Sequence, residues 1–123
     1  MEKEVDVITL CKKLVELTNL EICSWRETSE NNRYKLSLKN GSIEIHHFRP
    51  ADIDFLNAEY YDVSLFDNKA ERYATYKATS TDGDRYKVFY NLYTAVLKLL
   101  EKIRRRKIAL LFEELETQEE TKK

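Results

Sequence analysis

The stretch RYKLSLKNGSIEIHHF, residues 33–48, decides the fold of this 123-residue chain. Apolar and polar side chains alternate on both sides of Asn40 and Gly41, as they do in strands with one buried face. Asn-Gly is a strong hairpin signal because both residues readily adopt positive φ angles. The stretch therefore predicts an antiparallel hairpin with a tight primed turn centred on Asn40 and Gly41.

The same alternation extends the hairpin into a larger sheet. It is weak in EICSWRET, residues 21–28, and clear in YYDVSLFD, residues 60–67, and RYATYKAT, residues 72–79. Short turns join most of these strands, whereas parallel pairs need crossovers of a dozen or more residues. We therefore expect a five-stranded antiparallel meander, with a longer loop at residues 49–59. The side chains expected to face the core are Leu36, Leu38, Ile43, Ile45, Val63 and Leu65.

Helical periodicity flanks the sheet on both sides. It predicts a helix from about Glu4 to Thr18 and a long helix from STDGDRY, residues 80–86, to about Leu115. The long helix would measure about 45 Å, more than twice the length of a typical strand, so it should overhang the sheet. The sequence thus predicts an α+β fold with both helices on one sheet face. Residues 1–115 would form one domain and residues 116–123 a disordered acidic and lysine-containing tail.

The composition argues against several classes of protein. Basic and acidic residues number 21 and 22, so the chain lacks the positive excess typical of nucleic-acid-binding proteins. No apolar run reaches the roughly 20 residues of a membrane span. Cys11 and Cys23 have the spacing of neither a zinc site nor a disulfide framework. We expect a cytoplasmic protein without a cofactor or membrane contact.

The pair His46-His47 raises the question of a metal site. Successive strand residues point to opposite faces, so the two rings cannot hold the same ion. We therefore interpret them as structural and expect neither a metal site nor catalytic residues, since no nucleophile or phosphate-binding glycine motif occurs. The alternative is a small metal-dependent hydrolase that uses His46 with Asp52 and Asp54.

The face of the sheet away from the helices is the first candidate for function. The alternation predicts that aromatic side chains gather there, and such side chains dominate protein-binding hot spots. With Lys35, Lys39 and Lys77, the same face could instead bind single-stranded nucleic acid. The alternative is that the loop at residues 50–59 shields the rings, or that some strands lie in the opposite register and bury them. The expected partner-binding residues are Trp25, Phe48, Tyr60, Phe66 and Tyr73, with Cys23 beside them.

The end of the long helix is the second candidate. A basic run, KIRRRK at residues 102–107, precedes an apolar strip and then an acidic run. Two antiparallel copies would place each basic run opposite its partner's acidic run, as a two-fold dimer requires. The alternative is a solvated helix surface whose strip packs within its own domain. The expected self-association residues are Arg104, Arg105, Ile108, Leu111, Phe112 and Leu115, and Arg106 is expected to add charge complementarity.

Three segments resemble small single-domain bacterial proteins that are themselves uncharacterised. They are WRETSENNRYKLSLKNGSIEI, YYDVSLFDNKAERYATY and YNLYTAVLKLLEKIRRRK, which carry a W-x-x-T-S segment and a Y-x-L-S-x-x-N-G-S hairpin. The resemblance covers residues 25 to about 108 and implies a bacterial cytoplasmic protein. It implies no activity or site residues. The sequence as a whole favours a non-enzymatic protein-interaction module that forms a homodimer.

Overall fold

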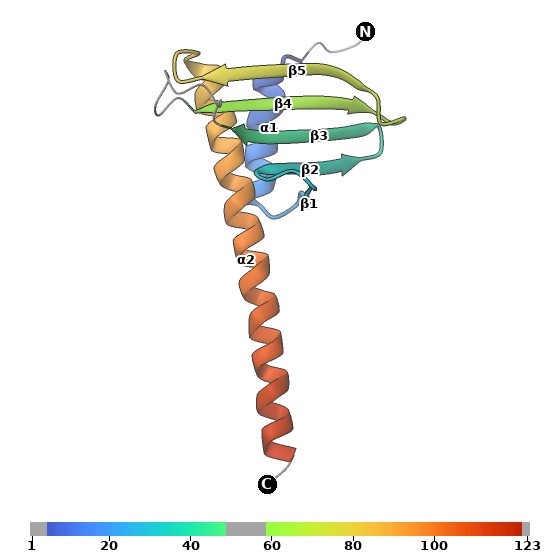
Figure 1. Ribbon diagram of the computed structural model, residues 1–123, viewed down its shortest axis with the longest axis vertical. Coiled ribbons are helices and arrows are strands. Elements are labelled where there is room, and N and C mark those ends of the chain that lie inside the picture. Colours follow the sequence, from blue (N-terminus) through green and yellow to red (C-terminus); the bar gives the residue numbers. More distant parts are fainter. Residues whose placement is uncertain (1–4, 49–58, 122–123) are drawn as a thin grey trace.

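The computed structural model describes residues 5–48 and 59–121. Five strands form one antiparallel sheet in the order β1-β2-β3-β4-β5, which confirms the predicted α+β meander (Figure 1). The elements in chain order are α1 (Val7–Asn19), β1 (Trp25–Glu27), β2 (Arg33–Leu38), β3 (Gly41–Phe48), β4 (Tyr60–Asp67), β5 (Arg72–Thr79) and α2 (Asp84–Thr121).

The β2–β3 hairpin lies at the predicted place, but its turn is shifted by one residue. Leu38 pairs with Gly41, so Lys39 and Asn40 form the turn and Gly41 belongs to β3. Of these turn residues only Gly41 has a positive φ, of 151°, so the predicted primed turn centred on Asn40 and Gly41 is wrong. A Cβ at Gly41 would overlap the backbone carbonyl oxygen of Phe66 on β4, so this position of β3 requires glycine.

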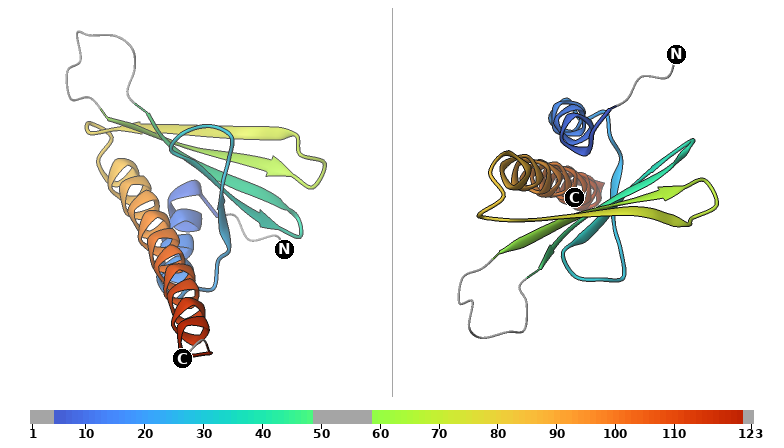
Figure 2. Two further views of the ribbon diagram at one scale, coloured as in Figure 1. Left: turned by 60° about the horizontal axis from the view of Figure 1, so that its bottom comes forward. Right: turned by 90° about the horizontal axis from the view of Figure 1, so that it is seen from above.

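Both helices lie on the same face of the sheet, side by side (Figure 2). The core between the layers joins Cys11 and Leu14 of α1 to Phe89 and Val96 of α2 and to the inward side chains of the strands. The predicted inward residues Leu36, Ile43, Ile45 and Val63 are buried, and Leu65 is partly buried. Leu38 is the exception at 55% exposed, because it sits at the hairpin end of the sheet.

Trp25 does not lie on the outer face of the sheet. It pairs with Leu36, so both side chains point toward the helices, and Trp25 is only 3% exposed. Its Nε1 donates a hydrogen bond to the Thr18 hydroxyl in the last turn of α1, over 2.9 Å. Cys23 also packs against the core. The prediction of these two residues as outer-face contacts is therefore wrong.

The long helix extends beyond the sheet, as expected (Figure 1). Its 38 residues correspond to about 57 Å, and its buried residues end at Leu99. It ends at Thr121 rather than near Leu115, so residues 116–121 are helical and not a disordered tail. Residues 116–121 include three glutamates and one glutamine, which favour helix, and this explains the extension. No helix in the described part of the chain has both the length and the apolar character needed to cross a bilayer.

Candidate functional site

The aromatic residues on the outer face of the sheet form two separate groups. Phe48 stacks on Tyr60 with ring centroids 5.5 Å apart and on His46 at 5.2 Å, where β3 ends and β4 begins. Phe66 lies toward the opposite end of β4 and is covered by the Arg72 guanidinium, 5.7 Å from the ring centroid. The single aromatic patch expected from the sequence is therefore divided.

The position of Tyr73 results from a register shift between β4 and β5 that the sequence does not indicate. The β4–β5 register shifts between Leu65 and Phe66, which pair with Ala74 and Arg72. Tyr73 is the extra residue and is exposed. It borders a shallow hollow at the hairpin end of the sheet together with Leu38. It is not part of the stacked group around Phe48.

A polar row separates the two aromatic groups. Arg33 donates to Glu44 over 3.0 Å, to Glu30 over 2.9 Å and contacts His46 Nδ1 at 3.1 Å. The same His46 nitrogen lies 3.5 Å from Asp62. Burial disfavours the charge of Arg33, but the hydrogen bonds to Glu44 and Glu30 outweigh it, so the pKa of Arg33 is raised. This part of the outer face is an internally paired charge network.

The two histidines lie on opposite faces, as the strand geometry predicts. His46 belongs to the polar row, whereas the ring of His47 stacks on Tyr61 at 4.8 Å and contacts Tyr93 at 5.2 Å. Asp52 and Asp54, which would complete the alternative metal site, lie outside the described residues. Among the described residues, no three His, Cys, Asp or Glu side chains gather closely enough to hold a metal ion.

A tyrosine cluster on the helix-covered face is a feature that the sequence did not indicate. Its rings come from β2, β4 and α2 and have centroids between 5.5 and 6.4 Å apart. Burial raises the pKa of Tyr93 to about 12 and also raises that of Tyr61, so both phenols stay neutral. The cluster packs α2 onto the sheet. Its members are Tyr34, Tyr61, Tyr86, Tyr90 and Tyr93.

The basic run of α2 contacts the domain itself. Arg106 lies 2.8 Å from Glu21, which follows α1, and Lys102 lies 3.7 Å from the same carboxylate. The Arg106 hydrogen bond is the largest cause of the lowered pKa of Glu21. Arg104 reaches Glu27 of β1 at 3.5 Å. We call residues 98–106 the neck, because beyond Arg106 no described side chain of α2 forms a hydrogen bond or ion pair with the rest of the chain.

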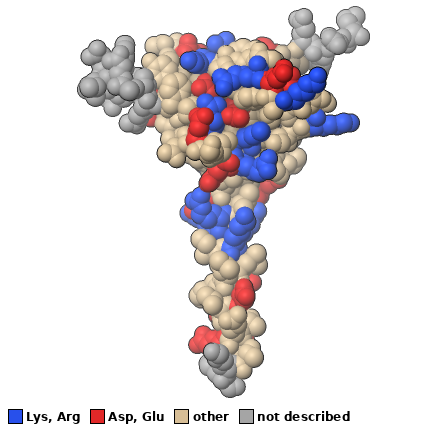
Figure 3. Space-filling model, turned by 45° about the vertical axis from the view of Figure 1, so that its right-hand side comes forward, with Lys and Arg blue, Asp and Glu red and all other residues tan. Residues whose placement is uncertain are grey.

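The stem, residues 107–121 of α2, stands free of the domain (Figure 3). Every side chain of the stem is exposed, including those of four predicted self-association residues. At about 1.5 Å per residue the stem measures about 22 Å. Figure 3 shows positive charge at the neck and negative charge toward the far end, with uncharged surface between. The exposed apolar residues are Ile108, Leu110, Leu111, Phe112 and Leu115.

One line of side chains links the stem to the head, which is the rest of the domain. Its members alternate at spacings of four and three residues, the heptad pattern of helices that pair. The line begins at Leu97, which is 38% exposed on the solvent side of α2. We call this line the seam, and it consists of Leu97, Glu101, Arg104, Ile108, Leu111 and Leu115. Phe112 and Leu110 lie beside it and opposite to it, respectively.

No family model, curated protein or solved structure matches the chain.

Proposed function

We propose that this chain is a non-enzymatic protein-interaction module that forms a homodimer through the stem. The carrying observation is that the stem is a regular helix with an exposed apolar strip and no support from its own domain. An isolated helix of about this length is marginal in water. Burying the strip against a second copy supplies the packing that the rest of the chain does not.

Antiparallel pairing fits the charges of α2 best. With the centre between Leu111 and Phe112, each Ile108 meets the Leu115 of the other copy. Arg104 then lies level with Glu119 of the other copy. Parallel pairing would instead place like charges side by side along the neck and along the acidic end, which is destabilising. A two-fold contact repeats each favourable pair.

The acidic end of α2 also favours a partner. The negative side chains Glu113, Glu114, Glu116, Glu119 and Glu120 crowd its last turns, and the last turn contains no basic residue. Acidic groups at the C-terminus of a helix oppose the helix dipole. Cations from a second copy would offset both the repulsion among these glutamates and their unfavourable interaction with the helix dipole.

Substitution of one seam residue tests the proposal. Leu111→Asp should convert the dimer into a monomer, because burying a leucine side chain contributes about 1.5–3 kcal/mol and each dimer contains it twice. The matched control is Leu110→Asp, which introduces the same charge one residue away. The two leucines are similarly exposed, at 61% and 63%, but Leu110 points away from the seam.

Sedimentation equilibrium of the three full-length proteins provides the measurement. A dimer for the unsubstituted chain and for Leu110→Asp, with a monomer for Leu111→Asp, supports the proposal. A monomer for the unsubstituted chain at all accessible concentrations rejects it. Equal loss of the dimer in both variants would show that the contact does not use the seam.

The outer sheet face has weaker support as a binding surface. Trp25 is buried, and the remaining aromatic residues are divided by the polar row. Lys35 and Lys77, proposed as nucleic-acid contacts, each neighbour a carboxylate: Glu44 lies opposite Lys35, and Asp62 opposite Lys77. Protein or nucleic-acid binding at this face therefore remains secondary to the stem proposal.

A further inference from the structure

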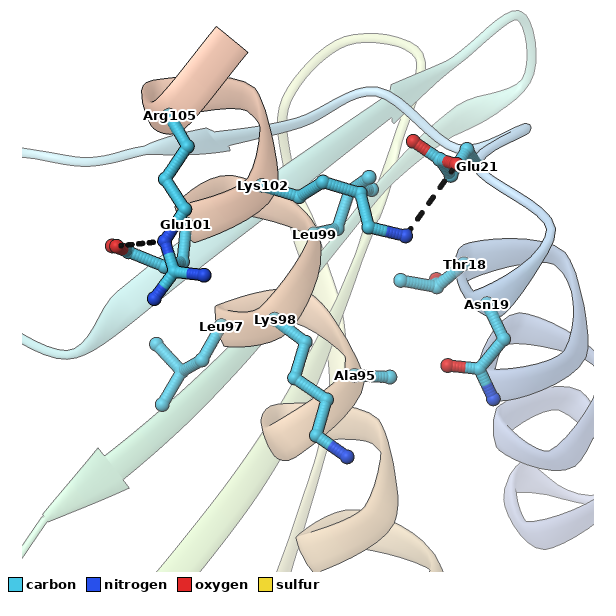
Figure 4. A pocket seen from close by; sticks show the side chains of 10 residues that line it. All are labelled: Thr18, Asn19, Glu21, Ala95, Leu97, Lys98, Leu99, Glu101, Lys102 and Arg105. Carbon is cyan, nitrogen blue, oxygen red and sulfur yellow. Dashed lines mark hydrogen bonds and ion pairs between the residues drawn. The ribbon is translucent and has the colours of Figure 1, made fainter. Parts of the chain in front are cut away.

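A groove opens at the neck, between the end of α1 and α2 (Figure 4). Its volume of about 520 Å³ lies within the range of small-molecule sites, roughly 300–1,000 Å³. Three buried residues form its floor, one from α1 and two from α2: Thr18, Ala95 and Leu99. Leu97 adds a further apolar side chain to the wall. The groove can therefore accommodate a small molecule with an apolar part.

Lysine side chains border this floor. Lys98 and Lys102 of α2 both extend toward α1, where Asn19 also lines the groove (Figure 4). Lys102 shares the Glu21 carboxylate with Arg106. Among the side chains that the structure describes, no carboxylate forms an ion pair with Lys98. Lys98 therefore presents an ammonium group to the groove without a carboxylate beside it.

The carboxylates at the neck are too few to neutralise its cations. Glu101 is shared between Arg104 and Arg105, at 3.0 and 3.2 Å, and Arg104 also lies 3.5 Å from Glu27. Around the groove, the five cations Lys98, Lys102, Arg104, Arg105 and Arg106 thus face the three carboxylates Glu21, Glu27 and Glu101. A local excess of positive charge attracts anions. The groove is therefore suited to a negatively charged ligand.

We infer that the neck groove binds a small molecule that carries a phosphate group, with the phosphate beside Lys98 and Lys102 and the apolar part on the floor. A phosphate monoester has a charge of about −1.5 to −2 at pH 7 and three acceptor oxygens. The two ammonium groups and the Asn19 amide supply donors for these oxygens. The site does not require the stem to pair, because Ile108 lies about two and a half turns beyond Leu99.

The alternative is that the two lysines stabilise the end of α1. This helix has no basic residue in its last turn, and cations near a helix C-terminus offset the negative end of the dipole. Such a role predicts that Lys98→Met lowers the free energy of unfolding and that the groove binds no phosphate. Ligand binding by the unsubstituted chain distinguishes the two roles.

Titration of the isotope-labelled full chain with three probes, followed by NMR, tests the proposal. Phenyl phosphate carries the phosphate and an apolar ring, inorganic phosphate lacks the ring, and benzoate carries a single negative charge on the ring. We expect saturable shifts at residues 18–21 and 95–102 with phenyl phosphate. Inorganic phosphate and benzoate should both bind more weakly, because each lacks one of the two features that the groove recognises.

Substitutions of Lys98 identify the phosphate-binding group. Lys98→Met should weaken the binding of phenyl phosphate by about tenfold, because a hydrogen bond to a charged group is lost. Lys98→Arg keeps the charge and should retain most of the binding. The matched control is Lys87→Met, which removes an exposed lysine from the same side of α2, eleven residues or about 17 Å earlier. This variant should bind like the unsubstituted chain.

Shifts confined to the groove, with binding weakened in Lys98→Met but not in Lys87→Met, support the site. Shifts spread over all basic surfaces, or an equal loss in both variants, would show that phosphate only screens charge and would overturn the proposal. Binding of inorganic phosphate or benzoate as tight as that of phenyl phosphate would overturn the proposed ligand class. Absence of binding, with a destabilised Lys98→Met, would assign the lysines to the end of α1.

Discussion

The indole Nε1 of Trp25 donates a hydrogen bond over 2.9 Å to the hydroxyl of Thr18, and both side chains are buried. The bond joins the last turn of α1 to the first strand across a short connection. It satisfies the one polar atom of a large ring that otherwise packs among apolar side chains. The residue that the sequence suggested as a surface anchor therefore fixes the first helix to the sheet.

Replacing Thr18 by valine should lower the free energy of unfolding by about 1–3 kcal/mol, because the shape is kept but a buried donor loses its acceptor. Thr18→Ser retains a hydroxyl and should recover part of the loss. Urea unfolding followed by fluorescence provides the measurement, since Trp25 is the only tryptophan of the chain. Equal stability of Thr18→Val and the unsubstituted chain would show that the bond contributes nothing.

Arg33 should be the most sensitive residue of the polar row. Its guanidinium and the Glu44 carboxylate are mostly buried and 3.0 Å apart. Arg33→Met should lower the free energy of unfolding by about 2–4 kcal/mol, because it leaves the buried Glu44 carboxylate without its partner. Adding Glu44→Gln should return part of that loss. Thermal unfolding of the single and double variants gives the coupling between the two residues.

A matched control for that cycle is Arg26→Met. Arg26 lies on the adjacent strand and forms a long, exposed hydrogen bond of 3.3 Å to Ser37. Its loss should change the stability by no more than about 0.5 kcal/mol. A similar cost for both arginines would mean that the network at Arg33 has no special role.

The free energy of unfolding should fall at alkaline pH because of the buried thiol of Cys11. Burial raises the pKa of its thiol to about 12, whereas an unfolded thiol titrates near 8.5. The pKa of the thiol is higher in the folded state than in the unfolded state. The contribution of Cys11 to stability is therefore complete below about pH 8.5 and is lost as the pH rises toward the pKa of the folded state. In this range Cys11→Ala should reduce the slope of stability against pH by up to about 1.4 kcal/mol per pH unit.

Tyr61 and Tyr93 also have raised pKa values and act in the same direction at higher pH, so slopes and not absolute stabilities must be compared. Cys23→Ala serves as the control, because this thiol is only partly buried. Urea unfolding from about pH 8 to 10 covers the range in which the unfolded thiol ionises. Identical slopes for Cys11→Ala and the unsubstituted chain would contradict the prediction.

Two glycines should respond differently to alanine. At Gly41 the added Cβ would overlap the backbone oxygen of Phe66, so β3 and β4 must separate locally. At Gly83, where φ is 55°, the space is open and only the left-handed conformation opposes alanine, at about 1–2 kcal/mol. Gly41→Ala should therefore be the more destabilising change. Thermal unfolding of both variants checks the order.

The sequence predicted the larger elements well because their periodicity is imposed by burial. Strands β4 and β5 have the predicted bounds, although Tyr61–Ser64 of β4 are all buried and the β4–β5 register shifts between Leu65 and Phe66. Strand β1 has three residues, too few to determine which side chains face inward. The phase of β1 is set instead by pairing with β2, a tertiary contact that local alternation does not report. This explains the error at Trp25.

The candidate site was predictable for a similar reason. The apolar strip from Ile108 to Leu115 is a helical pattern, and the overhang follows from comparing helix and strand lengths. The contacts of the basic run with Glu21 and Glu27 were not predictable, because these carboxylates are about 80 residues away along the chain and meet the neck only after folding.

The order of the strands also bears on how the chain folds. Because each strand pairs with its neighbour in the sequence, the sheet can form through contacts of low contact order, which favours rapid folding. Closing the core is different, since α1 packs against the beginning of α2 at the other end of the chain. On a ribosome, the sheet could therefore form as its strands emerge, but the part of its inner face that α2 covers would stay exposed until α2 had been synthesised.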